Sequence, residues 1–177
     1  MRAPLTVLLF VSAVSTAALQ AQPAVGDFAP RFALPYATRD TIVQKPTSLD
    51  QLLRQGAVIL AFYPADWSSG CTKEVCAIRD GFSRLSDLHV TVVGISGDYV
   101  YSHQAWARQL GLGFKLMSDH AHAVAKNYGS YNEATGHDRR TVFLVTRTGT
   151  IAYEDLNYDV SDSRSYDALL AAVASLR

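Results

Sequence analysis

The two cysteines of this 177-residue sequence, Cys71 and Cys76, stand close together at the start of a predicted helix. The N-terminus of a helix carries partial positive charge and unpaired N–H groups. A sulfur atom placed there is stabilised as the thiolate, which is the nucleophilic form of cysteine. Cys71 is therefore a candidate reactive thiol. The alternative is an inert cysteine of the core, since free cysteines are among the most buried residues.

The residues next to Cys71 argue against the inert alternative. Ser68, Ser69, Gly70 and Thr72 are small and polar, unlike the neighbours of a core cysteine. Two cysteines are also too few to staple a small domain with disulfides. The pair therefore needs another explanation, and a second thiol on the same helix favours redox chemistry.

A buried strand leads into this site. Residues 57–63 form a continuous apolar run, which is typical of a central strand covered on both faces. A proline loop at 64–70 and a helix at 71–88 follow. Residues 22–46 are expected to be extended with short strands, and the remaining pattern predicts helices at 48–53, 101–110, 120–128 and 166–176, and strands at 89–96, 114–117, 141–146 and 150–153.

Strands that alternate with helices predict the α/β class, with a central mixed sheet flanked by helices. The last two strands flank Arg147, Thr148 and Gly149, which is a hairpin signal and adds antiparallel pairing. No repeat and no linker interrupts the pattern. Residues 22–177 are therefore expected to form a single domain.

The first 21 residues have the features of a secretory signal peptide. Arg2 precedes an uncharged, largely apolar run at 5–19, and small residues follow it. Spanning a bilayer takes about 20 apolar residues, so an uncleaved membrane anchor is the weaker alternative. We expect residues 1–21 to be removed and the mature protein to be exported, to the periplasm or the medium, without a membrane anchor.

The charge balance excludes several kinds of partner. The chain has 16 Lys and Arg residues, 16 Asp and Glu residues and a formal net charge of zero. That balance argues against binding to nucleic acid or to an anionic membrane. His120 and His122 lack the i, i+4 spacing of a helical zinc pair, so we expect no metal and no cofactor. All five histidines are expected at the surface, at His89, His103, His120, His122 and His137.

The spacing Pro64-x-x-x-Ser68-x-x-Cys71 resembles the signature of the peroxiredoxins, thiol peroxidases of the alkyl hydroperoxide reductase and thiol-specific antioxidant family. The second cysteine, Cys76, follows Cys71 by five residues, and this spacing resembles that of the bacterioferritin comigratory protein subgroup. The resemblance extends over residues 24–175. It implies a thioredoxin-like fold with the N-terminal extension of a peroxiredoxin.

The resemblance also implies a reaction. Cys71 corresponds to the peroxidatic cysteine, which attacks a peroxide oxygen and becomes a sulfenic acid. Cys76 corresponds to the resolving cysteine, which forms an intramolecular disulfide with Cys71, as in an atypical 2-Cys peroxiredoxin. Hydrogen peroxide and organic hydroperoxides are the implied substrates. A thioredoxin-like protein or another dithiol is the implied reductant, and a monomer is the implied assembly.

Three further residues match the site of the family. Arg140 is expected to favour the Cys71 thiolate by its charge and to polarise the peroxide, whereas Arg139 is expected at the surface. The Ser68 hydroxyl is expected to bond the sulfur and the substrate oxygen. Pro64 has no N–H and a rigid ring, so it is expected to wall the pocket.

Three more side chains are weaker candidates near this site. Glu74 and Tyr63 are expected to support the catalytic residues. Trp67 is expected to pack in the wall of the pocket, without contacting the substrate.

Two rival functions differ in class. A thioredoxin-like disulfide oxidoreductase, also exported, uses Cys-x-x-Cys and a cis-proline, whereas this chain has a longer spacing and no proline after Pro64. Thr141 stands about where that proline would be. The other rival is a peroxide-sensing redox module, which would be oxidised once without sustained turnover.

The spacing of the two cysteines sets a geometric problem. Five residues of ideal helix place the Cα atoms of Cys71 and Cys76 roughly 8.7 Å apart. A disulfide tolerates a Cα separation of about 7 Å at most. The start of the helix is therefore expected to unwind when the disulfide forms.

Overall fold

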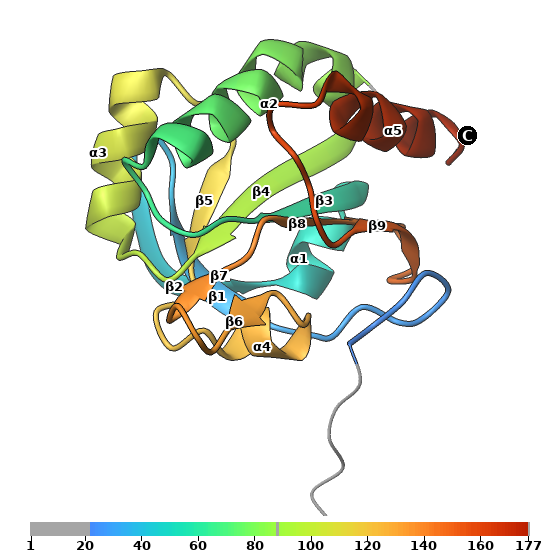
Figure 1. The fold of residues 1–177 in the computed structure, drawn as a ribbon, viewed down its shortest axis with the longest axis horizontal. Coiled ribbons are helices and arrows are strands. Elements are labelled where there is room, and N and C mark those ends of the chain that lie inside the picture. The colour runs from blue at the N-terminus through green and yellow to red at the C-terminus, as the bar shows by residue number, and fades with distance from the viewer. Residues whose placement is uncertain (1–21, 88, 177) are drawn as a thin grey trace, which may run out of the picture.

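The apolar run after residue 56 forms strand β3 (Ala57–Phe62), in the interior of a seven-stranded mixed sheet (Figure 1). The computed structural model describes residues 22–87 and 89–176. The strands lie in the order β2-β1-β5-β4-β3-β8-β9. β3 pairs in parallel with β4 and antiparallel with β8, so its backbone is hydrogen-bonded along both edges. The other strands of this sheet are β1 (Ala33–Ala37), β2 (Ile42–Ser48), β4 (Val90–Ser96), β5 (Lys115–Ser118), β8 (Thr141–Val145) and β9 (Ile151–Asp155).

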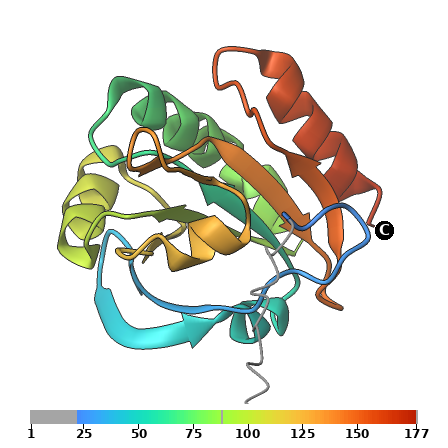
Figure 2. The same ribbon diagram turned by 60° about the horizontal axis from the view of Figure 1, so that its bottom comes forward.

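Helices cover both faces of the sheet, which explains why β3 is apolar at every position. α2 (Ser69–Asp87), α3 (Val100–Leu110) and α5 (Ser163–Ala174) lie on the upper face in Figure 1. α1 (Leu49–Leu53) and α4 (Ala123–Asn127) lie on the lower face, which Figure 2 turns toward the viewer.

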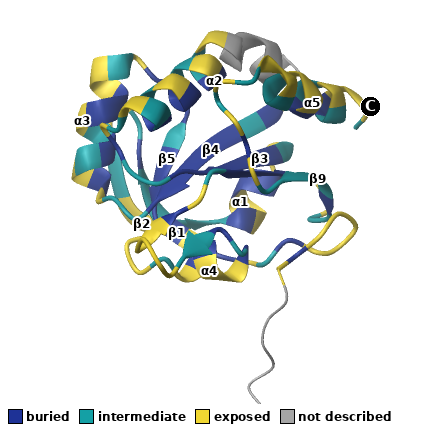
Figure 3. Ribbon diagram, in the orientation of Figure 1, coloured by how far each residue is buried: buried dark blue, intermediate teal, exposed yellow. Residues whose placement is uncertain are grey.

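Alternate residues of β3 enter two separate cores. Ile59 and Ala61 pack in the core under α2, α3 and α5, and Tyr63 follows them there. Leu60 and Phe62 pack in the core over α1 and α4. Figure 3 shows the central strands as the buried centre of the molecule. The segment that follows β3 is thus attached to a rigid base.

Helix boundaries agree with the sequence pattern to within a few residues. α1 begins after Ser48, whose hydroxyl accepts a hydrogen bond from the Gln51 N–H while the Gln51 side chain accepts one from the Ser48 N–H. α2 begins two residues earlier than predicted, at Ser69. α5 begins three residues earlier, because the Asp162 carboxylate caps it by accepting from the Arg164 N–H.

One element was not predicted, and one prediction lies outside the described residues. β6 (Tyr131–Asn132) and β7 (His137–Asp138) form a small antiparallel ladder apart from the main sheet. Its turn contains Gly136 at a φ of 72°, a conformation that favours glycine. The predicted signal peptide, residues 1–21, falls outside the described part. Within 22–87 and 89–176, no helix has the length and apolar character needed to cross a bilayer.

Candidate active site

Cys71 lies in the first turn of α2, directly after the loop that leaves β3. The side chain is fully buried, in the core that also holds Val75 and Ile78 of the same helix. Cys76 lies further along α2 and is half-buried, and both cysteines are free thiols. The helix therefore carries both sulfurs, as the sequence predicts, and holds them on a regular backbone.

Ser68 stands where a helix cap is needed. Its hydroxyl oxygen accepts a hydrogen bond from the Cys71 N–H at 3.3 Å, and its carbonyl accepts from the Thr72 N–H and hydroxyl, each at 2.9 Å. Serine is favoured at this position because it accepts from an N–H that the helix leaves unpaired. The O–H proton of Ser68 is not used in that bond. It remains able to donate to a substrate oxygen.

Arg140 reaches the same helix from the residue before β8. Its Nη1 donates to Glu74 Oε2 at 2.7 Å, and its guanidinium lies near enough to Cys71 for the charges of the two groups to interact. Arg139 is exposed and donates to the carbonyl of Gly129 instead. The structure therefore brings Arg140 to Cys71 and leaves Arg139 at the surface, as the sequence interpretation has it.

The charges of this cluster are mutually dependent. Burial works against the charge of Arg140, but the negative charges of Cys71 and Glu74 outweigh it and raise the Arg140 pKa above its usual value. Burial raises the pKa of Glu74 to about 7, and the nearby Arg140 opposes that rise. Oε1 of Glu74 is buried without a hydrogen-bond partner. Arg140 is thus a permanent cation, whereas Glu74 changes its charge near neutral pH.

Gly70 makes the approach of Arg140 possible. A Cβ atom at Gly70 would lie 2.6 Å from Nη2 of Arg140, closer than non-bonded atoms tolerate. The guanidinium therefore rests directly on the backbone of the first helical turn. A side chain at this position would displace it.

A pocket of about 610 Å³ opens beside the cluster. Pro64, Arg139 and Arg140 line it, whereas Cys71 and Ser68 are not among its lining residues. The opposite wall comes from the segment between β9 and α5, including Tyr158, whose N–H donates to the Arg140 carbonyl. This wall could not be predicted from the sequence, because residues 156–161 carry no motif.

Two sequence interpretations near the site are wrong. Trp67 does not line the pocket of Pro64 and Arg140. It is 51% exposed, and its indole N–H donates to Ser102 Oγ on α3. His103 is not a surface residue: it is fully buried and contacts the carboxylate of Asp66. Both errors concern contacts between the loop and α3, which lie far apart in the sequence.

The other histidines are spread over different surroundings. His89, His120 and His137 are exposed, as expected, whereas His122 is partly buried and contacts Asp138. Across residues 22–87 and 89–176, no three side chains of His, Cys, Asp and Glu gather in a way that would hold a metal ion.

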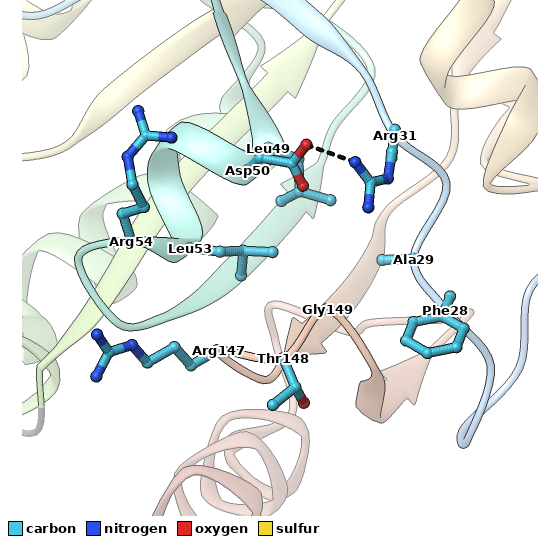
Figure 4. A pocket seen from close by; sticks show the side chains of 10 residues that line it. All are labelled: Phe28, Ala29, Arg31, Leu49, Asp50, Leu53, Arg54, Arg147, Thr148 and Gly149. Carbon is cyan, nitrogen blue, oxygen red and sulfur yellow. Dashed lines mark hydrogen bonds and ion pairs between the residues drawn. The ribbon is translucent and has the colours of Figure 1, made fainter.

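A second pocket, of about 540 Å³, lies at the other end of the sheet (Figure 4). It is bounded by Arg54, Arg147 and an Arg31–Asp50 ion pair at 2.8 Å. Residues 147–149 form the β8–β9 turn, next to the beginning of β3, whereas Cys71 follows its end. None of the predicted site residues lines this pocket.

Thr141 occupies the position that separates the two enzyme classes considered above. It pairs with Phe62 at the end of β3 and is fully buried, and its hydroxyl is hydrogen-bonded to Ser130. A threonine therefore faces the end of the strand where a disulfide oxidoreductase would carry proline.

Comparison with known proteins finds similarity to one family and to peroxiredoxins within it. The model of the AhpC/TSA family matches residues 25–154. A bcp peroxiredoxin of Coxiella burnetii is 39% identical over 134 residues, covering 72% of this chain and 85% of that protein. The chloroplastic peroxiredoxin Q of Sedum lineare is 33% identical over 134 residues, covering 75% and 71% of the two chains.

Solved structures share the fold. The crystal structure of peroxidoxin BcpB from Mycobacterium tuberculosis matches with a TM-score of 0.77 at 28% identity, covering 88% of this chain and 99% of that one. Enterococcus faecalis AhpC matches with the same TM-score at 24% identity, covering 87% and 92%, which shows the fold alone. The predicted fold class, a thioredoxin-like mixed sheet flanked by helices, is confirmed.

Proposed function

Because the chain belongs to the AhpC/TSA family, whose peroxiredoxins are thiol-dependent peroxidases, we propose that it reduces peroxides through Cys71 and resolves the product through Cys76. The observation that supports this assignment best is the contact of Arg140 with Cys71 at the start of α2. A permanent cation beside a thiol at a helix N-terminus favours the thiolate. It also offers a donor to the peroxide oxygen that becomes negatively charged as the bond breaks.

The chemistry follows from the groups around Cys71. The thiolate attacks one peroxide oxygen, the O–O bond breaks, and the other oxygen leaves as water or as an alcohol after taking up a proton. Cys71 is then a sulfenic acid. Arg140 and the free proton of the Ser68 hydroxyl face the developing charge, and Pro64 limits access of water. Hydrogen peroxide and organic hydroperoxides are the proposed substrates.

The second step joins the two sulfurs. The Cys76 thiolate attacks the sulfenic sulfur, a disulfide forms, and the oxygen leaves as water. In the reduced state both residues are helical, which separates their Cα atoms by roughly 8.7 Å. The first turn of α2 must therefore unwind. A thioredoxin-like protein or another dithiol is the proposed reductant of the resulting disulfide.

The decisive experiment is peroxide consumption coupled to NADPH through a thioredoxin system, with wild type, Cys71→Ser and Cys76→Ser. Cys71→Ser is expected to abolish turnover. Cys76→Ser is expected to consume one equivalent of peroxide and then to stop as a sulfenic acid, which dimedone traps at Cys71. Dimedone labelling at Cys76 alone would reverse the two assignments.

The outcome also separates the rival functions. A peroxide sensor would show one rapid oxidation of the wild type and no sustained turnover with any competent dithiol. A disulfide oxidoreductase would exchange disulfides with a protein substrate without consuming peroxide. Sustained peroxide turnover by the wild type contradicts both rivals.

Two properties complete the proposal. The protein is proposed to act outside the cytosol after removal of residues 1–21, which N-terminal sequencing of protein from its host would test. It is proposed to be a monomer with an intramolecular disulfide, so the oxidised protein should run as a monomer on a non-reducing gel. An intact Arg2 end in the mature protein, or a disulfide-linked dimer, would contradict these two points.

A further inference from the structure

The loop between β3 and α2 is tied to α3 by a buried polar cluster that the proposed chemistry does not use. The cluster consists of Tyr63, Asp66, Ser102 and His103. The side chains of Asp66 and His103 are both completely buried. A buried carboxylate is costly unless hydrogen-bond donors surround it. Its placement under a catalytic loop therefore calls for a physical explanation.

Asp66 is the hub of the cluster. Its carboxylate accepts from the Tyr63 hydroxyl at 2.8 Å and from the Ser102 hydroxyl at 2.7 Å, and Nδ1 of His103 lies 2.9 Å from it. Its backbone N–H donates to Asp98 Oδ2 at 2.8 Å. One residue of the loop is thus fixed from both its side chain and its backbone.

His103 connects the loop to the sheet as well as to α3. Its Nδ1 faces Asp66, and its Nε2 lies 3.3 Å from the carbonyl oxygen of Met117 on β5. Both ring nitrogens therefore face oxygen atoms, and the ring has one orientation that satisfies both. Because β5 and α3 are parts of the rigid fold, the position of Asp66 is set by the fold and not by the loop itself.

Trp67, the residue after Asp66, has a strained backbone conformation that the contacts of Asp66 help to hold. Trp67 has a φ of 65°, in the left-handed region that bulky side chains avoid. Such a conformation persists only where the surroundings determine it. Here the indole N–H donates to Ser102 Oγ at 3.0 Å, and the ring lies against Trp106. Ser102 is therefore shared between the strained residue and Asp66.

We propose that Asp66 and His103, with Ser102, are positioning residues that fix the first half of the peroxidatic loop. They would hold the backbone from which Ser68 and Cys71 extend. They would also confine the unwinding that disulfide formation requires to the residues after Trp67. The effect on rates rests on the proposed peroxidase function, whereas the effect on the backbone does not.

The arrangement makes a specific kinetic expectation. Misplacement of a reacting group by about 1 Å can reduce a rate on the order of 100-fold. The contacts among Asp66, Ser102 and His103 form an anchor for the loop, and loss of this anchor should therefore slow oxidation of Cys71 by peroxide. It should not slow formation of the disulfide, because that step needs the helix start to move. A residue with a merely structural role would affect both steps together with stability.

The experiment measures the two steps separately by stopped flow, following sulfenic acid formation and then disulfide formation in the full chain. Asp66→Asn keeps the shape of the side chain and replaces one acceptor by a donor. We expect oxidation of Cys71 to be about 10- to 100-fold slower and disulfide formation to be unchanged or faster. His103→Gln should have a similar effect. In the double variant, oxidation of Cys71 should be at most about threefold slower than in the slower of the two single variants. The effects of residues that act as a unit do not add.

His120→Gln is the matched control. His120 lies in the connection between β5 and α4 and contacts the hydroxyl of Tyr99, the residue before α3, at 2.7 Å, but it has no hydrogen bond to Asp66, Ser102 or His103. Its rates should equal those of the wild type. If Asp66→Asn does not fold, Ser102→Ala removes the hydroxyl that donates to Asp66 and accepts from Trp67, and it should slow oxidation several-fold without slowing disulfide formation.

Amide hydrogen exchange tests the anchor without any peroxide. Exchange at residues 65–68 should accelerate in Asp66→Asn, while exchange in β3 should not. Unchanged oxidation rates in folded Asp66→Asn and His103→Gln would overturn the proposal, as would equal slowing of both steps. If the wild type itself does not react with peroxide, the peroxidase function fails, and the exchange measurement still decides whether Asp66 fixes the loop.

Discussion

The two halves of the loop that ends in Cys71 are held by different kinds of contact. Residues 63–67 are bound by buried and partly buried side chains of α3 and the preceding turn, through the carboxylates of Asp66 and Asp98. Residues 68–72 are held by the hydroxyl and carbonyl of Ser68 and by the guanidinium of Arg140. The first set of contacts reaches across the fold, whereas the second is local except for one long side chain.

This difference fits the two demands of a peroxidase that forms a disulfide within one helix. Attack on a peroxide requires that the sulfur, Arg140 and Ser68 keep fixed relative positions. Disulfide formation requires that the same helical turn opens, because a regular helix keeps the two sulfurs apart. A first half fixed by tertiary hydrogen bonds and a second half whose hydrogen bonds are mainly local would satisfy both demands within ten residues of chain. The predictions below alter one half at a time.

The largest effect is expected for Arg140, whose guanidinium reaches the second half of the loop from the residue before β8. Arg140→Ala should lower the rate of Cys71 oxidation about 10²- to 10³-fold, since removing one donor to a developing oxyanion has effects of this size. Stopped-flow measurement of the single-turnover rate reports it.

Arg139→Ala is the control, because Arg139 is adjacent in sequence and lines the same pocket, but its guanidinium donates to the Gly129 carbonyl and is not placed against Cys71. Its rate should stay within about twofold of the wild type, as for most surface substitutions. Equal rates for the two variants would contradict the assigned role of Arg140.

Much of this site could be predicted from the sequence, for reasons that are local. Pro64, Ser68 and Cys71 lie within one short segment that directly follows β3. Their spacing in the sequence alone therefore places them close together at the end of that strand. Arg140 was matched by resemblance, and antiparallel pairing of β8 with β3 brings it to the helix start. The strand and helix order followed from apolar periodicity.

The anchor could not be predicted in the same way. Asp66 and His103 come from segments 37 residues apart, and the order of elements does not fix which face of α3 meets the loop. The lack of a metal-site pattern led to the expectation that all histidines lie at the surface, and this was wrong for His103, which is buried against Asp66. The Tyr158 wall was missed because its segment has no regular structure and no motif.

Glu74→Gln tests the charge next to Arg140 and is expected to have the second-largest effect. The pKa of Glu74 is raised by burial to about 7, from an ordinary value of 4.5. The folded state therefore binds the proton more tightly than the unfolded state. Stability from this group is complete below pH 4.5 and is lost as the pH rises through 7, because the folded protein must then bury a charge.

The expected loss is roughly 2.5 kcal/mol between pH 5 and pH 8. Glutamine stays neutral, so this part of the pH dependence should vanish in Glu74→Gln. Urea unfolding at pH 5 and pH 8 measures it, in a Cys71→Ser background so that the thiol makes no contribution. If the free energy of unfolding changes equally with pH in Glu74→Gln and in its parent protein, Glu74 is ionised at both pH values. Arg140 then compensates the burial of the Glu74 charge fully.

The smallest effect is expected for Gly70→Ala, which stiffens the second half of the loop. Alanine favours a helix over glycine by about 1 kcal/mol, so the first turn of α2 should become more stable. Its Cβ also meets Nη2 of Arg140 at 2.6 Å and must push the guanidinium away. The guanidinium is the end of a flexible side chain, so the protein should still fold.

Both consequences of Gly70→Ala slow the enzyme, but at different steps. Displacement of Arg140 should slow Cys71 oxidation about tenfold, a fraction of the loss from removing the side chain. The stiffer turn should slow disulfide formation by up to about fivefold, the factor that 1 kcal/mol represents. Ser69→Ala is the control, since Ser69 is exposed in the same turn and also gains helix propensity. It should slow only disulfide formation. Gly70→Ala could instead stabilise the protein and leave the rate of disulfide formation unchanged. That result would show that the start of α2 does not unwind during the reaction. The two cysteines would then have to meet by movement of the segment around Cys76.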